Sequence, residues 1–285
     1  MLHPLSDNPS GHDRPEVIVS CTDCGCRYNS YGQVLSDRYI GRRGSRWCPD
    51  CRKIRVRAFE QHEHDVREAR LRFQREAWVQ DNRRGIPELF RGKDFSNFDL
   101  GGNEDRVSAL RKYAETFPVD SRPKGAQSIL IARDINGVGK THLTCAILRT
   151  IIDRSSDIDR EVCPYQFWPI YRIKQRLLDA QRFNGAETVA QVYLDFASMW
   201  LLVIDDVGKD LPSGYEASAA YEMYFTIINE RYNAQLPIIV SSNLGFAPWA
   251  SDGLCLQDLM GKACASRLME MTGGVEYVIE GKDRR

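Results

Sequence analysis

The chain has 285 residues, 42% of them hydrophobic, and its 39 lysines and arginines balance its 39 aspartates and glutamates. This size and apolar content allow one full α/β core and a small additional module. No apolar run is long enough for a transmembrane helix, and there is no internal repeat or low-complexity tract, which excludes membrane-spanning and repeat architectures.

The amino end carries three prolines and a glycine within its first fifteen residues: Pro4, Pro9, Gly11 and Pro15. We expect residues 1–15 to be disordered, because such a composition buries little apolar surface. The segment also lacks the apolar core of a secretory signal, so we expect a cytoplasmic protein.

Four cysteines form two closely spaced pairs, Cys21 with Cys24 and Cys48 with Cys51, and 23 residues separate the pairs. Two thiolates on one tight turn occupy adjacent corners of a tetrahedron, and a second turn alongside completes a closed structural site for Zn²⁺. We therefore predict a zinc-ribbon-like, zinc-binding domain over residues 16–56. Disulfide bonds are the alternative, disfavoured because no secretory signal is present. Cys26 is an alternative ligand to Cys24.

Residues 27–57 hold nine lysines or arginines against two aspartates, so this module is locally basic. Its arginines lie beside Tyr39 and Trp47, and such a combination can contact nucleic-acid phosphates and stack on bases. The same charges would also suit an acidic protein surface, or would simply keep an exposed hairpin soluble.

From Lys53 to about Asp81 the chain is heavily charged, with a thin apolar stripe at helical spacing and with acid–base pairs four residues apart. This pattern predicts a charged linker helix, which we place at residues 57–84. The helix would serve as a lever, contact a partner helix, or simply connect two domains.

An apolar run at residues 128–132 is followed by Asn136, Gly137, Val138, Gly139, Lys140, Thr141 and His142. Glycines let a loop curl tightly enough to turn its backbone N–H groups towards a triphosphate. Lys140 would bind the β and γ phosphates, the Thr141 hydroxyl would bind Mg²⁺, and the helix that begins here would direct its positive dipole end at the anion. We therefore predict a P-loop for ATP, although Asp134 stands where the pattern has a glycine.

A second apolar run, residues 201–204, ends in Asp205 and Asp206. In an open α/β sheet the carboxyl end of a strand is the edge where ligands bind. Asp205 would hold Mg²⁺ and Asp206 would polarise the attacking water. A glutamate usually has the second role, and aspartate is shorter by about 1.5 Å. We therefore expect slow hydrolysis unless a backbone shift compensates.

A third apolar run, residues 238–241, is followed by Asn243, which is either a turn residue or the side chain that orients the water. Strand-like runs at 128–132, 165–169, 201–204, 238–241 and 275–279 alternate with helical stretches. This alternation predicts an α/β domain at residues 85–285, with a parallel sheet covered on both faces.

In order and spacing these motifs resemble the DnaC and IstB group of AAA+ ATPases over residues 84–285. The matching segments are 84–87 with Phe95 and Phe98, then 139–143, 201–205, 229–232, 241–243 and 266–268. The resemblance implies an AAA+ P-loop fold with five parallel strands, ATP at a subunit boundary and self-association through the ATPase domain. It also implies an arginine that reaches into the neighbouring site. Arg267 occupies the matching position and Arg231 is a second candidate, and each has the alternative of a local ion pair.

The resemblance further implies an ATP-dependent loader of a replicative hexameric DNA helicase onto single-stranded DNA, since some loaders carry an amino-terminal zinc-binding domain that docks on the helicase. Two alternatives stay open. One is a transposition helper that binds duplex DNA as an ATP-stabilised filament. The other is a nucleotide-dependent adaptor with little hydrolysis, a role compatible with the short side chain of Asp206.

Overall fold

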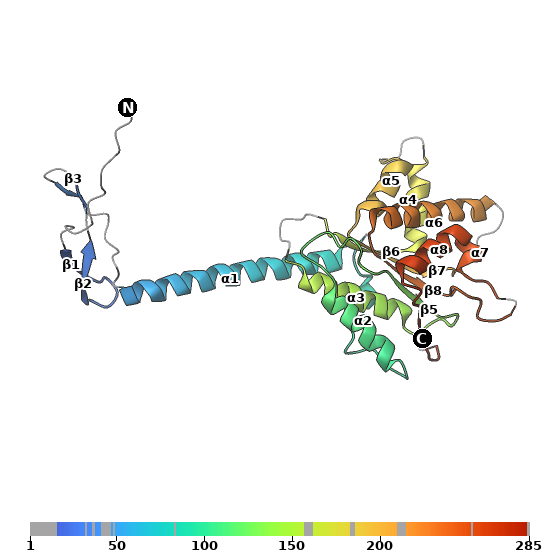
Figure 1. Cartoon of the computed structure of the whole chain (residues 1–285), viewed down its shortest axis with the longest axis horizontal. Helices are drawn as coiled ribbons and strands as arrows, with labels where there is room; N and C mark the ends of the chain where they lie inside the picture. The colour runs from blue at the N-terminus through green and yellow to red at the C-terminus, as the bar shows by residue number, and fades with distance from the viewer. Residues whose placement is uncertain are drawn as a thin grey trace, which may run out of the picture. The chain divides into compact units, whose positions relative to one another are not determined.

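The structure, a computed structural model, describes residues 16–31, 33–35, 38–40, 47, 49–82, 84–156, 162–182, 186–209, 215–251 and 253–283. The chain divides into two compact units, Met1–Ala69 and Arg70–Arg285 (Figure 1). The expected disorder of residues 1–15 concerns a segment outside the described residues. Within those ranges, no helix has the length and apolar character needed to cross a membrane.

The first unit contains two short antiparallel hairpins. Strand β1 (Glu16–Ser20) pairs with β2 (Arg27–Tyr31), and β3 (Gln33–Leu35) pairs with β4 (Arg38–Ile40). The tight turn between β1 and β2 is closed by two hydrogen bonds: the Cys21 N–H donates to Cys26 O at 2.8 Å, and the Gly25 N–H donates to Cys21 O at 2.9 Å. Gly25 has a φ of 72°, which a glycine adopts without steric cost.

Helix α1 (Pro49–Gln80) begins earlier than we predicted. Proline suits the first helical position, because its fixed φ is helical and its missing N–H would have no partner there. Asp50 in the first turn stabilises the helix, because its negative charge lies near the positive end of the helix dipole. The linker helix therefore starts within the second cysteine pair and not at residue 57, and Cys51 lies on its first turn.

The second unit is built on a five-stranded parallel sheet with the order β6-β7-β8-β5-β9. The strands are β5 (Ile129–Ala132), β6 (Tyr165–Pro169), β7 (Leu201–Val207), β8 (Ile238–Ser242) and β9 (Tyr277–Val278). Each of the five apolar runs overlaps one of these strands, so the predicted five-stranded parallel sheet is confirmed.

Helices cover both faces of the sheet (Figure 1). One face packs against α2 (Glu104–Thr116) and α3 (Lys140–Arg154). The other packs against α4 (Ile170–Ala180), α5 (Val189–Ser198), α6 (Tyr215–Ala234), α7 (Leu256–Met260) and α8 (Lys262–Met271). Ile129 and Ile131 of β5 belong to the first core, whereas Leu130 and Ala132 belong to the second. The strands are mostly apolar because both faces of the sheet are buried.

The last turns of α1 belong to the second unit. Leu71, Trp78 and Val79 are buried, and the latter two lie in the core that contains α3. The Arg75 guanidinium donates two hydrogen bonds to Ser155 O, at 2.9 and 2.6 Å. We expected the ATPase domain to begin at residue 85, but the compact unit begins at Arg70, because these side chains complete its core.

Candidate nucleotide-binding site

The predicted P-loop connects the carboxyl end of β5 to the first residue of α3. Gly137 and Gly139 have φ values of 72° and 103°, which place both in the left-handed region that glycine tolerates. A Cβ on Gly139 would lie 2.5 Å from Cε2 of Phe98, so the loop also needs glycine for this close approach. The loop thus leads directly into a helix amino terminus, a ready anion site.

Lys140, the first residue of α3, is buried, and its Nζ donates hydrogen bonds to Arg133 O at 2.8 Å and to Ile135 O at 2.9 Å. The ammonium group therefore lies inside the curl of the loop. Asp134 lies between Arg133 and Ile135 in the sequence. Its carboxylate is 3.4 Å from the Nε of Arg133, and its side chain is half exposed. The Asp134 carboxylate is not part of the cavity wall described below.

Thr141 and Asp205 meet from separate segments, α3 and β7. The Thr141 hydroxyl donates to the two carboxylate oxygens of Asp205, at 3.2 and 3.0 Å. Asp205 is 4% exposed, and burial raises its pKa to about 6. The hydrogen bond that the Ser241 hydroxyl donates opposes this rise in pKa, whereas the negative charge of Asp206 adds to it. A hydroxyl and a carboxylate in contact are the oxygen ligands that Mg²⁺ prefers.

Asp206 follows in β7, where the register between β7 and β8 shifts. Its φ is 62°, and its N–H donates to the Ser241 hydroxyl at 3.0 Å. The Lys209 Nζ lies 3.5 Å from its carboxylate. The strand backbone is therefore irregular at this residue.

Asn243, after β8, lies against the P-loop. Its amide Nδ2 donates to Asn136 Oδ1 at 3.3 Å, which ties the end of β8 to the phosphate loop. Its Oδ1 is buried and has no hydrogen-bond partner among the described residues. Asn136 lines the cavity, whereas Asn243 stands behind it.

A cavity of about 770 Å³ extends from the P-loop along the ends of β6 and β7. Its polar part is formed by Asn136, Gly137, Gly139, Lys140, Thr141, His142, Asp205 and Asp206. Val138 is absent from this wall, because its side chain is fully buried in the core and only its backbone is left for a phosphate. The predicted nucleotide-binding residues are thus brought together around one cavity, except that the side chain of Val138 points into the core.

The rest of the cavity wall is mainly apolar and was not predicted from spacing. It consists of Pro87, Leu89, Phe90, Phe98, Phe167, Pro169 and Tyr171 with a few polar neighbours. The Phe167 N–H donates to Arg84 O at 2.8 Å, which fixes the segment before Pro87 against β6. The His142 ring nitrogen lies 2.8 Å from Asp94 O, and its ring meets Phe98 edge-on. A polar end beside an apolar end fits a triphosphate joined to a flat base.

The two candidate arginines differ in position. Arg231 is fully buried and donates to three carbonyl oxygens, those of Phe196, Met199 and Pro237. It therefore joins the end of α5 and the residue before β8 to α6. Because its side chain is fully buried, the prediction that Arg231 reaches into a neighbouring ATP site was wrong.

Arg267 of α8 lies over the rings of Phe225 and Tyr232, 5.3 and 5.9 Å from their centroids. One of its terminal nitrogens, Nη1, is buried and lacks a hydrogen-bond partner in the described part of the chain. Among the described residues, the contacts that hold the guanidinium are therefore those with the two rings of α6.

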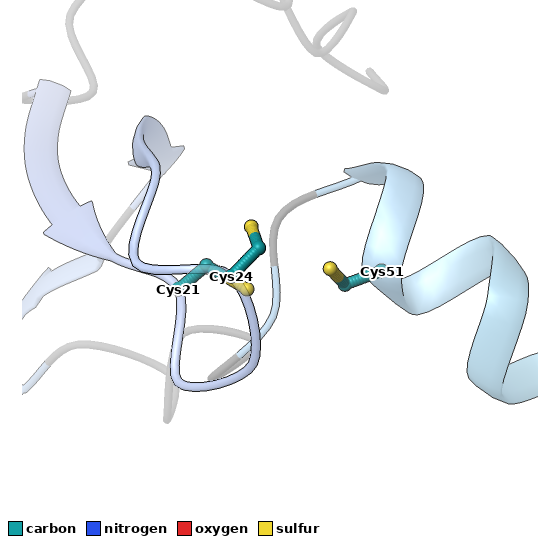
Figure 2. Close-up of side chains that lie close together, drawn as sticks. All are labelled: Cys21, Cys24 and Cys51. Atoms are coloured by element: carbon teal, nitrogen blue, oxygen red, sulfur yellow. The ribbon is translucent and has the colours of Figure 1, made fainter.

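The first unit gathers three of the predicted zinc ligands (Figure 2). The Sγ atoms of Cys21, Cys24 and Cys51 all lie within 4.8 Å of one another, and the fourth predicted ligand, Cys48, is outside the described residues. A tetrahedron with Zn–S bonds of about 2.3 Å has edges of about 3.8 Å, so the three sulfurs fit a zinc ion after small shifts. Cys26, the alternative ligand, has its Sγ 3.2 Å from that of Cys24.

An ion pair fastens the two cysteine segments together. Arg55, one turn after Cys51, donates to both carboxylate oxygens of Asp23, at 2.6 and 2.9 Å. These hydrogen bonds hold the pKa of Asp23 below its ordinary value. The Arg55 guanidinium also lies 4.6 Å from the centre of the Trp47 ring.

The fold and the cavity define a P-loop ATP-binding protein of the AAA+ class. The family model described as IstB-like ATP binding protein matches residues 121–280, and the chain belongs to this family.

The chain is also similar to a known protein in sequence and to solved structures in fold. The replicative helicase loader DnaC of Escherichia coli K12 is 26% identical over 167 residues, which are 57% of this chain and 61% of the relative, so the match spans about three fifths of that protein. The crystal structure of the DnaC helicase loader has a TM-score of 0.50 at 20% identity, over 68% of this chain and all of that one. AMPPCP-bound DnaA from Aquifex aeolicus gives 0.47 at 21% identity, over 70% of this chain and 53% of that one.

Proposed function

We propose that the chain hydrolyses ATP with Mg²⁺ and uses this reaction to load a replicative hexameric DNA helicase onto single-stranded DNA. The observation that carries the ATPase part is the convergence of Lys140, Thr141 and Asp205 on one cavity. The 26% identity with DnaC supports the loading part.

Each polar residue of the cavity has a role in this proposal. Lys140 exchanges its two carbonyl partners for the β and γ phosphates, and Thr141 and Asp205 hold Mg²⁺ through their oxygens. Bound there, Mg²⁺ neutralises phosphate charge. Asp206 orients and polarises the attacking water, and Asn243 fixes the loop residue Asn136 beside it.

Self-association would complete the site. An arginine that enters a neighbouring site stabilises the charge that develops during phosphoryl transfer, by roughly 10³ to 10⁵ in rate in GTPases. Arg267 is our candidate, because within the described ranges its Nη1 has no hydrogen-bond partner and its guanidinium lies over two aromatic rings. ATP would then close adjacent protomers around single-stranded DNA, and hydrolysis would release the complex.

The first unit would bind the helicase. In our proposal Cys21, Cys24, Cys48 and Cys51 hold a structural Zn²⁺, and Cys26 is the alternative ligand to Cys24. The ion would supply much of the folding free energy of a unit too small to bury a sufficient core.

The ATPase part is tested by measuring phosphate release with and without single-stranded DNA, for the wild type and for Asp205→Asn. We expect ATP-dependent turnover that the substitution abolishes while ATP binding persists. Asp134→Asn is the matched control, since it removes one carboxylate of the same region that lies outside the cavity wall. ATP binding without phosphate release under every condition would favour the alternative of a nucleotide-dependent adaptor.

The loading part is tested by co-purification with a hexameric helicase. We expect complex formation that Cys21→Ser abolishes and that Cys145→Ser, a buried cysteine of α3 far from the metal ligands in sequence, preserves. Filaments on duplex DNA without a helicase would instead favour the transposition helper, an alternative that is compatible with the IstB-like family description.

A further inference from the structure

Ser241, the fourth residue of β8, stands opposite the two acids of the cavity. The residues paired on either side of it are Ile204 with Val240 and Val207 with Ser242. Two residues of β7, Asp205 and Asp206, therefore face one residue of β8, which is the arrangement of a β-bulge. Bulges beside active sites commonly redirect a side chain.

The Ser241 hydroxyl bonds to both residues of the bulge. It accepts the N–H of Asp206 at 3.0 Å and donates to the carboxylate of Asp205. Ser241 is fully buried, so water does not compete for either hydrogen bond. One side chain therefore fixes the two acids relative to each other.

The bulge also explains why residue 206 is an aspartate. Its φ of 62° lies in the left-handed region. Aspartate is several-fold enriched there compared with most residues, because its short polar side chain tolerates that backbone conformation. A regular strand residue has a φ of about −120°, so the side chain of Asp206 leaves the backbone in a different direction, and its carboxylate lines the cavity.

We propose that Ser241 is a positioning residue for ATP hydrolysis: its hydroxyl holds the bulge that aims the Asp206 carboxylate, and this aim replaces the extra reach of a glutamate. Ser241 has this role only if the chain hydrolyses ATP as proposed above. The bulge itself is a property of the protein alone and is testable without turnover.

The first test compares Ser241→Ala with Ser242→Ala. Ser242 is an equally buried neighbour whose hydroxyl donates to Val207 O at 3.0 Å and bonds to neither acid. We expect Ser241→Ala to lower kcat by roughly a hundredfold, the cost of about 1 Å of misplacement, with KM and the Kd for ATP unchanged. Ser241→Thr, which keeps the hydroxyl, restores most of kcat. Equal kcat values for Ser241→Ala and the wild type would refute the proposal.

The second test changes the length of the acid in both backgrounds. In the wild type, Asp206→Glu lowers kcat, because a longer side chain overreaches from the bulge. With Ser241→Ala the bulge relaxes, and the same glutamate raises kcat above that of Ser241→Ala alone. A higher kcat for Asp206→Glu in the wild-type background would show that aspartate is merely too short, and would overturn the proposal.

Amide hydrogen exchange separates this proposal from the proposed function. The Asp206 N–H should exchange slowly in the wild type and in Ser242→Ala, and at least tenfold faster in Ser241→Ala, because its acceptor is lost. A wild type without turnover but with this exchange pattern would remove the ATPase function and leave the bulge intact. An unchanged exchange rate in Ser241→Ala would reject the role of Ser241, whatever the turnover.

Discussion

Asp206 combines an unfavourable backbone conformation with a position in the cavity wall. A residue other than glycine in the left-handed region costs about 1–3 kcal/mol, so we predict that Asp206→Gly stabilises the protein while it abolishes hydrolysis. The melting temperature should rise by roughly 2–4 °C for each kcal/mol gained in a domain of this size. Differential scanning calorimetry provides the measurement, and a lower melting temperature would mean that the strain is not released.

Asp134 departs from the P-loop pattern, yet its side chain is half exposed, pairs with Arg133 and stays out of the cavity wall. We therefore predict that Asp134→Gly leaves the affinity for ATP unchanged or tightens it, because the change removes a negative charge near the phosphates. A fluorescence titration with ATP measures this affinity. A marked weakening would indicate that the carboxylate orders the loop.

At the scale of elements, the chain reverses sharply at Gly85, between α1 and the apolar wall of the cavity. A Cβ at this glycine would lie 2.5 Å from Trp78 O, 2.6 Å from Val79 O and 2.8 Å from Asp81 O. We predict that Gly85→Ala destabilises the second unit by about 1–3 kcal/mol, the usual cost of overpacking, because backbone oxygens cannot move aside. Gly92→Ala, where a Cβ meets nothing within 4 Å, is the matched control in thermal unfolding. Equal melting temperatures for the two variants would contradict this reasoning.

The strands and the phosphate loop were predictable because their signals are local. The apolar runs that end in Asp205 and in the Ser241–Asn243 segment can each be recognised from a few consecutive residues. The apolar wall was not predictable, since Phe98 contacts Gly139 across some forty residues of sequence. The same holds for Ser241, whose role depends on a register shift between two strands. Helix α1 was predicted, but its start was missed because its first turn carries a metal-ligand pattern.

At the scale of the whole molecule, two compact units predict where the chain can be divided. A fragment of residues 70–285 retains Leu71, Trp78 and Val79, whereas one of residues 85–285 loses these buried side chains. A buried tryptophan alone contributes on the order of 3–5 kcal/mol, so the shorter fragment should melt at least roughly 6 °C lower. Circular dichroism during heating provides the comparison. Fragments of equal stability would place the end of α1 outside the domain.

The two units should also respond differently to metal removal. We predict that a chelator unfolds the cysteine-containing unit, because Zn²⁺ supplies its folding free energy, while ATP binding by the second unit survives. The reaction of the exposed thiol of Cys24 with a thiol reagent follows the first event, and nucleotide titration follows the second. Loss of both in one transition would refute the independence of the units.

The hydrogen bond from the Ile86 N–H to Val79 O, 3.1 Å long, joins the final turn of α1 to the segment that becomes the cavity wall at Pro87. A base seated against that wall would restrain this junction as well as the wall. Fraying at the carboxyl end of α1 should therefore diminish when ATP binds.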